Sequence, residues 1–494
     1  MDLSVLQNGS DIRGVAVKTP GSEVNFDGEA AFRIGAAFVQ FLREKYKKDR
    51  PSAAIGRDPR ISGPDLLEQA AKGMYSEGAE RVYDFGISTT PAMCVSTKDP
   101  SMNIDGAVMI TASHLPYDRN GMKFFTGPRG LNSEEIEIIL KKASKIKFNN
   151  SVNSLTLKTD YTDAYSKNLV SLVRQKTALN RPLEGFKIII DAGNGSGGFF
   201  VDKVLKTLGA NTDGSIFLEA DGMFPNHVPN PENANVMRNF SQHTKQQNAD
   251  LGILFDTDVD RAAFAGSDGT PIGGSRLIAL ISDIVLREYP NTCIVTDSVT
   301  SASLKDFIIS RGGTHHRFKR GYNNVINEAK RLNAEGTACH LAVETSGHCA
   351  LSENDFLDDG AYLAVKILIH FAQLRKSGLS LSDSLSGYKQ PAAEEALRFE
   401  IDRDDYKQFT LDLLRDFEKY AGQIQGWSAE TPNYEGVRIS CSRDSGCGWV
   451  LMRGSLHDPQ IAVNIESDCK EGIEIIKRKV SEFIQNYSGR GLRI

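Results

Sequence analysis

Lys187-Ile188-Ile189-Ile190-Asp191 is an apolar run that ends in an aspartate, and a Gly/Ser-rich segment follows it. The run predicts a buried strand. Residues 199–208 predict an amphipathic helix, and Gly209 predicts the end of that helix. A strand, a turn and a helix in this order make a βα unit, the building block of α/β domains.

Two other stretches repeat this pattern. The first has a strand at 53–58 and a helix at 66–74, and the second has a strand at 293–297 and a helix at 303–310. In both, the strand ends in an aspartate and glycine follows the helix within four residues. Three copies of one unit predict three similar mixed α/β domains.

The chain from about Gln390 has a different pattern. Strands are predicted at 396–401, 448–452 and 460–465, and helices at 405–420 and 471–486. This order predicts an α+β domain with an antiparallel sheet. We therefore expect an α/β protein of three similar domains followed by an α+β domain, packed around a central active-site cleft. The expected domain boundaries are 1–155, 156–272, 273–388 and 389–494.

Composition excludes several classes of protein. A formal net charge of −5 argues against a general nucleic-acid or membrane-surface binder, which is more often basic. No apolar run approaches the roughly 20 residues that span a bilayer, and the N-terminus lacks the basic start and apolar core of a signal peptide. The seven cysteines are scattered without a Cys-x-x-Cys pair, which favours a reducing compartment. We expect a soluble intracellular protein of the cytoplasm, or of an organelle stroma if a targeting segment has been removed.

A serine and a histidine stand next to each other in Thr111-Ala112-Ser113-His114, directly after the apolar run 106–110. A serine at the C-terminal end of a buried strand lies where open α/β sheets keep their chemistry. Lys123 follows ten residues later. Taken alone, the pair is a weak signal, because a turn with a surface histidine is common.

A carboxylate at every second position marks the loop 256–260, which follows the apolar strand 251–255. The three carboxylates belong to Asp256, Asp258 and Asp260. Such crowding is unfavourable unless a cation offsets it, and oxygen ligands suit Mg²⁺ or Ca²⁺. An EF-hand does not fit, because its required glycine is Arg261 here and its last glutamate is Ser267. A solvated acidic turn is the alternative.

The glycines of Gly193-Asn194-Gly195-Ser196-Gly197-Gly198 match the dinucleotide-binding pattern G-x-G-x-x-G. The segment lies in mid-chain, and Asn194-Gly195 is also an ordinary turn signal. We therefore interpret it as a structural turn.

Two polar loops complete the set of candidate sites. Glu344-Thr345-Ser346-Gly347-His348 offers hydrogen-bonding groups for sugar hydroxyls and an imidazole for acid–base chemistry, although a helix N-cap explains it equally well. Arg453-Gly454-Ser455-Leu456-His457-Asp458-Pro459 offers an arginine and a hydroxyl for a phosphate, although a plain hairpin loop is the commoner explanation.

In this order, the motifs resemble those of the α-D-phosphohexomutase family, which covers phosphoglucomutase, phosphomannomutase and phosphoglucosamine mutase. The resemblance spans essentially the whole chain. It also includes Gly9-Ser10-Asp11-Ile12-Arg13-Gly14 and Gly56-Arg57-Asp58-Pro59-Arg60.

The resemblance implies a role for each domain and for individual residues. In chain order, the domains would carry the phosphoserine, the metal, the sugar and the phosphate. The implied catalytic residues are Ser113, Lys123, His348 and Arg13. The implied Mg²⁺ ligands are Ser113, Asp256, Asp258 and Asp260. The implied substrate-binding residues are Arg261, Glu344, Ser346, Arg453, Ser455 and His457.

The resemblance also implies the reaction, an isomerisation that moves a phosphoryl group between the 1 and 6 positions of a glucose or mannose phosphate. The route passes through phosphorylated Ser113 and a hexose 1,6-bisphosphate, which also acts as the activator. The expected partners are small sugar phosphates, with neither nucleic acid nor membrane, and the expected state is a monomer or a dimer.

This chain departs from the family pattern at Leu456, His457 and Asp458 of the phosphate loop, at Val343 before Glu344, and at Asn323, where many members have lysine. Two alternatives therefore stay open. One is a hexose 1,6-bisphosphate synthase that uses another phosphate donor. The other is a catalytically weak paralogue that binds sugar phosphates.

Overall fold

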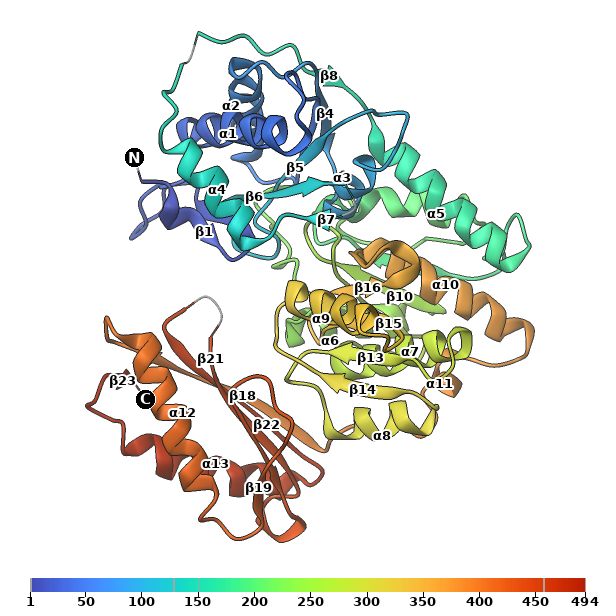
Figure 1. Ribbon diagram of the computed structural model, residues 1–494. Helices are drawn as coiled ribbons and strands as arrows, with labels where there is room; N and C mark the ends of the chain where they lie inside the picture. Colours follow the sequence, from blue (N-terminus) through green and yellow to red (C-terminus); the bar gives the residue numbers. More distant parts are fainter. Residues whose placement is uncertain (1, 128, 150, 456–457, 494) are drawn as a thin grey trace. The chain divides into compact units, whose positions relative to one another are not determined.

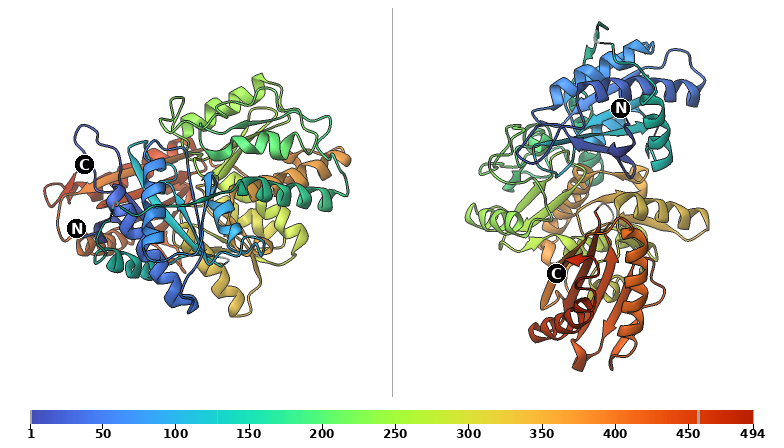
Figure 2. Two further views of the ribbon diagram at one scale, coloured as in Figure 1. Left: turned by 90° about the horizontal axis from the view of Figure 1, so that it is seen from above. Right: turned by 90° about the vertical axis from the view of Figure 1, so that its left-hand side faces the viewer.

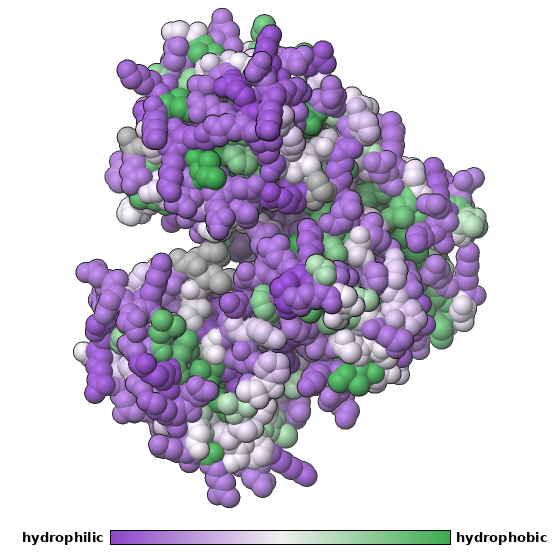
Figure 3. Space-filling view, in the orientation of Figure 1, coloured by the Kyte–Doolittle hydropathy of each residue, from purple (hydrophilic) through white to green (hydrophobic). Residues whose placement is uncertain are grey.

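The computed structural model describes residues 2–127, 129–149, 151–455 and 458–493. The chain divides into two compact units. The first unit consists of Met1–Gly273, Ser346–Ala350 and Leu357–Leu381, and the second of Gly274–Thr345, Leu351–Phe356 and Ser382–Ile494. Hydrophilic side chains cover most of the face drawn in Figure 3. No helix among the described residues is long and apolar enough to cross a membrane.

The first α/β domain is built on a mixed sheet with strand order β1-β2-β6-β5-β3-β4-β8, and β7 pairs with β6 (Figure 1). Its strands are β1 (Gln7–Asn8), β2 (Asp11–Val15), β3 (Ala53–Arg57), β4 (Val82–Ile87), β5 (Gly106–Ile110), β6 (Arg119–Thr126), β7 (Arg129–Gly130) and β8 (Leu157–Lys158). Its helices are α1 (Gly28–Tyr46), α2 (Gly63–Ser76), α3 (Thr90–Ser96) and α4 (Ser133–Ala143).

Two glycines let α1 and α2 pack against each other at close range. A Cβ on Gly35 would lie 2.2 Å from the carbonyl oxygen of Ala70, and a Cβ on Gly73 would lie 1.9 Å from that of Phe32. Either clash would force the helices apart and open the core, in which Phe38 and its neighbours are fully buried.

The second α/β domain has the sheet order β12-β11-β10-β9. Its elements are α5 (Tyr161–Thr177), β9 (Ile188–Asp191), α6 (Ala234–Gln246), β10 (Leu251–Phe255), β11 (Ala262–Gly266) and β12 (Pro271–Ile272). The helix predicted at 199–208 is irregular, with a 3-10 turn at Ser196–Gly198 and a π-helix at Val201–Leu205. A Cβ on Gly198 would lie 2.2 Å from the carbonyl oxygen of Leu218. This close approach fixes the backbone where a regular helix was expected to begin.

In the third α/β domain, β13 pairs in parallel with β14 on one side and with β15 on the other. The elements are α7 (Gly274–Glu288), β13 (Cys293–Thr296), α8 (Ala302–Ser310), β14 (Thr314–Arg317), α9 (Tyr322–Ala334), β15 (Cys339–Val343), β16 (Cys349–Leu351), β17 (Leu357–Asp358), α10 (Gly360–Lys376) and α11 (Leu381–Ser384).

The last domain is an antiparallel sheet with order β19-β20-β21-β22-β18-β23, and its two long helices pack on one face of that sheet (Figures 1 and 2). Its elements are β18 (Ala393–Ile401), α12 (Tyr406–Ala421), β19 (Trp427–Ala429), β20 (Val437–Cys441), β21 (Gly448–Gly454), β22 (Gln460–Ser467), α13 (Lys470–Gln485) and β23 (Leu492–Arg493). The predicted fold class, three mixed α/β domains followed by an α+β domain, is confirmed.

Three strands of this last domain, β19, β20 and β23, were not predicted from the sequence. β19 and β23 contain only three and two residues. β20 contains Arg438, whose side chain is buried, so its polar positions do not mark a solvent-facing side. The domain boundaries proposed from the sequence stay a prediction.

A capping box at the start of α4 gives a prediction about stability and pH. Glu135 accepts hydrogen bonds from the Asn132 backbone (3.0 Å) and from Arg129 (2.6 and 2.7 Å), and it pairs with Lys45 at 3.1 Å. Burial alone would raise the pKa of Glu135, but these donors outweigh burial and lower it to about 2. A carboxylate with a lowered pKa stabilises the folded state above its unfolded pKa, and the effect is lost as the pH falls toward 2.

We therefore expect Glu135→Gln to lower the melting temperature at pH 7 by the equivalent of about 1 kcal/mol, allowing for solvent screening. The difference from the wild type should shrink steadily between pH 5 and pH 3. Glu134→Gln, one residue earlier and exposed, is the control. Thermal denaturation of the three proteins across this pH range is the measurement, and a difference that does not change with pH would contradict the assignment.

Candidate active site

Ser113 follows β5 in a loop with unusual backbone geometry. Its φ of 51° lies in the left-handed region, which a residue with a Cβ seldom adopts. The Ser113 amide donates to Oγ1 of Thr111 at 2.8 Å, and the side chain is nearly buried. The fold thus holds this hydroxyl in one strained position, a feature that is common at functional sites.

A fully buried arginine, Arg60, holds the serine loop from behind. Its guanidinium donates to the carbonyl oxygens of Ser113 (2.5 Å) and Leu115 (2.6 Å), and also to that of Pro116. Its Nε pairs at 3.0 Å with Asp58, which in turn accepts a 2.7 Å bond from Thr111. One planar group therefore binds three carbonyl oxygens of the loop backbone.

The carboxylate loop joins β10 to β11, and its carboxylates converge. Oxygens of Asp256, Asp258 and Asp260 all lie within 4.8 Å of one another, and all three residues are buried. Val259 between them has a φ of 64°, a costly conformation for a β-branched residue. This left-handed residue turns the chain in the middle of the loop.

The glycine-rich segment supports the carboxylate loop. The Ser196 amide donates to the carbonyl oxygen of Thr257 at 2.8 Å, and a Cβ on Gly195 would meet that oxygen at 2.8 Å. Thr90 supports the same loop, because its amide and hydroxyl both donate to Asp258. The segment is a turn, as we interpreted it, and the absence of a Cβ at Gly195 lets the two loops touch.

Two buried cations offset the carboxylates. Lys123 Nζ lies 3.1 Å from Asp258 and 2.5 Å from Asp260. Arg261 Nε lies 3.1 Å from Asp256, and its Nη2 donates to Ser113 Oγ at 3.0 Å. Ser113 Oγ is also 3.4 Å from an Asp256 oxygen. The structure therefore brings the predicted serine, the three aspartates, Lys123 and Arg261 into one cluster.

The neighbouring carboxylates and cations shift the pKa values of Asp256 and Asp260 in opposite directions. Burial, together with the charges of Asp260 and Asp258, raises the pKa of Asp256 well above its usual range. Burial also opposes ionisation of Asp260, but Lys123, His348 and Arg261 outweigh it and lower the pKa. For Lys123, burial disfavours the charged form, and Asp258 and Asp260 reverse that effect and raise the pKa.

The cluster fits a divalent cation. Among the residues that the structure describes, Oδ1 of Asp258 and Oδ1 of Asp260 are buried without a hydrogen-bond partner. A buried carboxylate oxygen without a donor is costly, and a hard cation such as Mg²⁺ would satisfy both oxygens.

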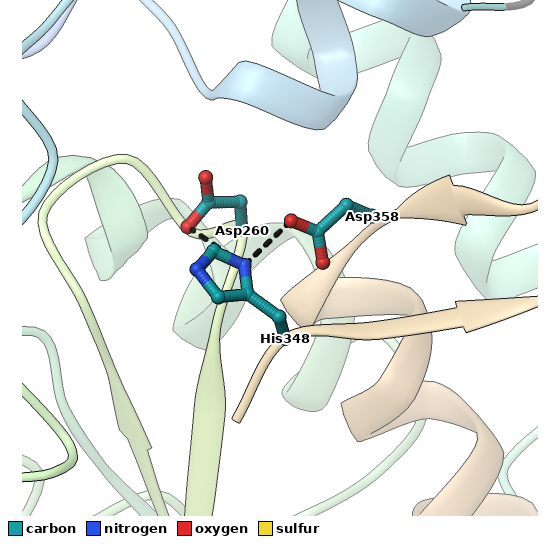
Figure 4. Close-up of side chains that lie close together, drawn as sticks. All are labelled: Asp260, His348 and Asp358. Carbon is teal, nitrogen blue, oxygen red and sulfur yellow. Dashed lines mark hydrogen bonds and ion pairs between the residues drawn. The ribbon is translucent and has the colours of Figure 1, made fainter. Parts of the chain in front are cut away.

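His348 lies beside this cluster, between Asp260 and Asp358 (Figure 4). Its Nδ1 is 2.5 Å from Asp358 and 3.9 Å from Asp260. Burial disfavours the imidazolium, but Asp358 and then Asp260 outweigh burial and raise the pKa of His348 to about 9. The ring therefore carries a proton near neutral pH and can serve as an acid or as a fixed positive charge.

His114 has the opposite environment. The guanidinium of Arg261 donates to its Nδ1. The charge of Arg261, with burial, lowers the pKa of His114 to about 2. Its Nδ1 is 3.4 Å from Ser113 Oγ. His114 is thus a neutral acceptor that orients Arg261.

Three comparisons bear on the family. The models of phosphoglucomutase/phosphomannomutase α/β/α domains I, II and III match residues 4–150, 160–269 and 273–390. A phosphoglucomutase/phosphomannomutase of Thermococcus kodakarensis is 31% identical over 451 residues, which is 90% of this chain and 91% of that protein. The chain belongs to the phosphoglucomutase/phosphomannomutase family.

Two other members of the family are similar to this chain over most of its length. A phosphomannomutase/phosphoglucomutase of Pseudomonas aeruginosa is 29% identical over 468 residues, covering 94% of this chain and 92% of that protein. The crystal structure of a phosphoglucomutase/phosphomannomutase family protein from Burkholderia thailandensis has a TM-score of 0.79 and 25% identity, and it covers 97% of each chain. The prediction that this protein is a mutase of the α-D-phosphohexomutase type is confirmed.

Arg13 and Ser346 are two further residues that the family resemblance suggested, and both belong to the first compact unit. Arg13, on β2, pairs with Asp11 at 2.8 Å and donates to the carbonyl oxygen of Thr111, so it lies against the serine loop. Ser346 is a buried residue of the first compact unit.

Three more belong to the second unit. Glu344 is buried and accepts a 2.5 Å bond from the Gly321 amide. Arg453 is buried at the end of β21, and Ser455 follows the same strand. His457, like Leu456, lies outside the described residues.

Two residues that support the site, Arg60 and Asp358, were not predicted from the sequence. Arg60 belongs to a motif that we quoted, but a charged residue after a strand gives no sign that it will be buried against a loop 53 residues away. Asp358 lies in a two-residue strand, and its position ten residues after His348 carries no recognisable spacing.

Arg60→Lys gives a test of the loop support. A lysine can replace one of the hydrogen bonds but cannot bind several carbonyls at once. We expect turnover to fall by about tenfold or more, since small displacements of a reacting group are costly, and we expect slower phosphorylation of Ser113. The measurements are kcat, KM and the rate of phosphate incorporation.

Arg43→Lys is the matched control. Arg43 also donates to two backbone carbonyls of the first domain, those of Asp49 and Glu77, but these lie away from the serine loop. Both variants should lose some thermal stability. Equal losses of turnover in both would show that Arg60 acts only through global stability.

Proposed function

We propose that this protein moves a phosphoryl group between the 1 and 6 positions of a hexose phosphate, through phosphorylated Ser113 and a hexose 1,6-bisphosphate intermediate. The observation that carries this proposal is the cluster around Ser113 Oγ. Arg261 lies 3.0 Å from that oxygen, an aspartate 3.4 Å from it, and two carboxylates of the same loop keep buried oxygens available. Glucose and mannose phosphates are the proposed substrates, because relatives carry the names phosphoglucomutase and phosphomannomutase.

The proposed metal ligands are the phosphoryl group on Ser113 and the carboxylates of Asp256, Asp258 and Asp260. Mg²⁺ bound there would neutralise the charge that develops on the transferring group. Lys123 would then keep its contact with part of this cluster as a fixed positive charge. Arg261 would hold the serine oxygen as it becomes the leaving group.

In the forward half-reaction, the bond between Ser113 Oγ and phosphorus breaks and a bond forms between phosphorus and a sugar hydroxyl oxygen. The hydroxyl proton has to leave, and His348, Lys123 and Arg13 are the proposed groups for proton transfer and charge stabilisation. The bisphosphate then turns around, and its other phosphoryl group returns to Ser113. A hexose 1,6-bisphosphate would also activate the unphosphorylated enzyme by the same step.

The proposed substrate contacts outside the cluster follow from side-chain chemistry. Glu344 and Ser346 would bind sugar hydroxyls. Arg453 and Ser455 would hold the phosphate that is not being transferred, because a guanidinium and a hydroxyl both donate to phosphate oxygens.

Ser113→Ala tests the phosphoryl carrier. We expect mutase activity to fall by about 10³-fold or more, as for removal of other nucleophiles, with an unchanged melting temperature. Intact-protein mass of the wild type should show one phosphoryl group that disappears on incubation with excess hexose phosphate. Ser101→Ala, at an exposed position of the same domain, is the control and should keep both properties. Near-normal turnover by Ser113→Ala would remove the central assignment.

Product analysis separates this function from the two alternatives. Accumulation of bisphosphate from a different phosphate donor, without isomerised monophosphate, would favour the synthase. Binding of sugar phosphate without any loss of phosphate from Ser113 would favour the binding paralogue.

The metal site has a test that does not need activity. Adding Mg²⁺ to chelator-treated protein should raise the melting temperature, by the equivalent of about 2.7 kcal/mol at roughly 100 times the dissociation constant. Asp258→Asn removes one charged ligand with little change of shape, so its response should be much smaller. Asp404→Asn, at an exposed position of the last domain, should respond like the wild type. Equal responses in all three proteins would contradict this site.

A further inference from the structure

One face of the last domain's sheet carries two arginines in a row. Arg398 on β18 lies opposite Ala462 on β22, and Ala462 lies opposite Arg453 on β21. Residues that are paired across antiparallel strands project from the same face. The two arginines are therefore neighbours on that face, two strand spacings or roughly 10 Å apart at their backbones. Only the small side chain of Ala462 stands between them.

Both arginines project away from the helices. Residues next to them in sequence, Met452, Leu397 and Phe399, pack in the core under α12 and α13. Because side chains alternate along a strand, Arg398 and Arg453 lie on the opposite face. Among the described residues of this domain, no helix packs on this face.

Part of this face is already occupied by the third domain. Arg438 lies over the Trp449 ring at 3.6 Å and donates to the carbonyl oxygens of Ser298 and Thr300 at 3.0 and 3.1 Å. Glu466 accepts a 2.9 Å bond from Ser301. The row of Arg398, Ala462 and Arg453 lies beyond these contacts, and Arg398 at its outer end is exposed.

Positive charge in this row exceeds negative charge. The carboxylate of Glu435 is 3.9 Å from Arg453, and it also accepts bonds from Ser298 and from the Arg320 amide. Nε of Arg453 is buried and has no hydrogen-bond partner among the residues that the structure describes. Within the same residues, no carboxylate forms an ion pair with Arg398.

The pKa of Arg453 is lowered, as expected where positive charge exceeds negative charge. Burial is the first cause that lowers it, and the positive charges of Arg320 and Arg398 lower it further, against the opposing effect of Glu435. The guanidinium groups of Arg320 and Arg398 both repel that of Arg453, and such an arrangement favours an anion among them.

We propose that Arg398 is a substrate-binding residue, which together with Arg453 holds the non-transferring phosphate of the sugar phosphate from two sides. This inference deepens the proposed function and rests on it for the identity of the ligand. A phosphomonoester dianion offers three oxygens, so two guanidinium groups can each bind it through paired N–H donors. Arg453 supplies the inner, buried contact and Arg398 the outer contact, reached first by an approaching anion.

The kinetic test compares Arg398→Ala and Arg398→Lys with the wild type. Loss of a charge-assisted contact that the ground state and the transition state share raises KM without lowering kcat. We expect KM for glucose 6-phosphate to rise about tenfold in Arg398→Ala, with kcat within about twofold of the wild type. Arg398→Lys should recover only part of the affinity, because lysine keeps the charge but lacks the paired donors. The dependence of KM on salt should be weaker in Arg398→Ala than in the wild type.

Arg415→Ala is the matched control. Arg415 is an exposed arginine of the same domain, on helix α12 of the other face, where it pairs with Asp412. Its removal changes the net charge equally and should leave KM unchanged. The same KM in Arg398→Ala and Arg415→Ala would overturn the inference.

A binding measurement makes the test independent of turnover. Titration calorimetry with glucose 6-phosphate on Ser113→Ala and on Ser113→Ala/Arg398→Ala should show about tenfold weaker binding by the double variant. If the wild type proves unable to isomerise but this difference persists, the proposed function fails and Arg398 still binds the phosphate. Equal dissociation constants would show that Arg398 takes no part in binding.

Discussion

The burial of three carboxylates in one short loop is the constraint on which the rest of the first compact unit depends. Asp256, Asp258 and Asp260 are almost wholly buried and mutually close. Without compensation such a group would neutralise itself by taking up protons. Lys123 and Arg261 supply that compensation from two different elements, and neither is itself exposed. Asp260, whose pKa Lys123 lowers from 2.5 Å away, can thus remain charged inside the protein only when the first and second domains are correctly folded.

The same constraint explains why the supporting backbone is strained and tightly packed. Ser113 and Val259 both adopt left-handed conformations, which cost about 1–3 kcal/mol each. The surroundings hold them in place through hydrogen bonds to backbone groups, from Arg60 to the serine loop and from Thr90 and Ser196 to the carboxylate loop. Strain stored at two adjacent loops places one hydroxyl and three carboxylates around a common point.

Sequence patterns predicted the features that depend on residues close together in the chain, namely the strands and the polar loops that follow them. The strands 106–110 and 251–255 are entirely buried apolar runs, and the loops after them carry the clustered serine and aspartates. Patterns failed where a polar residue is buried by distant contacts. Arg60, Asp358 and Arg438 look like surface residues in the sequence, and only the folded chain shows the partners that satisfy them. The helix predicted after β9 is present but irregular for a similar reason, because Gly198 at its start packs against the backbone of Leu218.

The loop from Glu344 to His348 crosses from one compact unit to the other. Glu344 and Thr345 belong to the second unit, where Thr345 donates to Asp297 at 2.6 Å. Ser346 and His348 belong to the first, where His348 pairs with Asp358 and Asp260. His348 therefore stays with the serine and the carboxylates whatever position the second unit takes, while Glu344 stays with the domain that carries Arg453. The proposed reaction includes an intermediate that must turn around, and this division agrees with that proposal. The groups proposed to act on the reacting oxygen are fixed to one unit, and groups proposed to hold the far end of the sugar phosphate are fixed to the other.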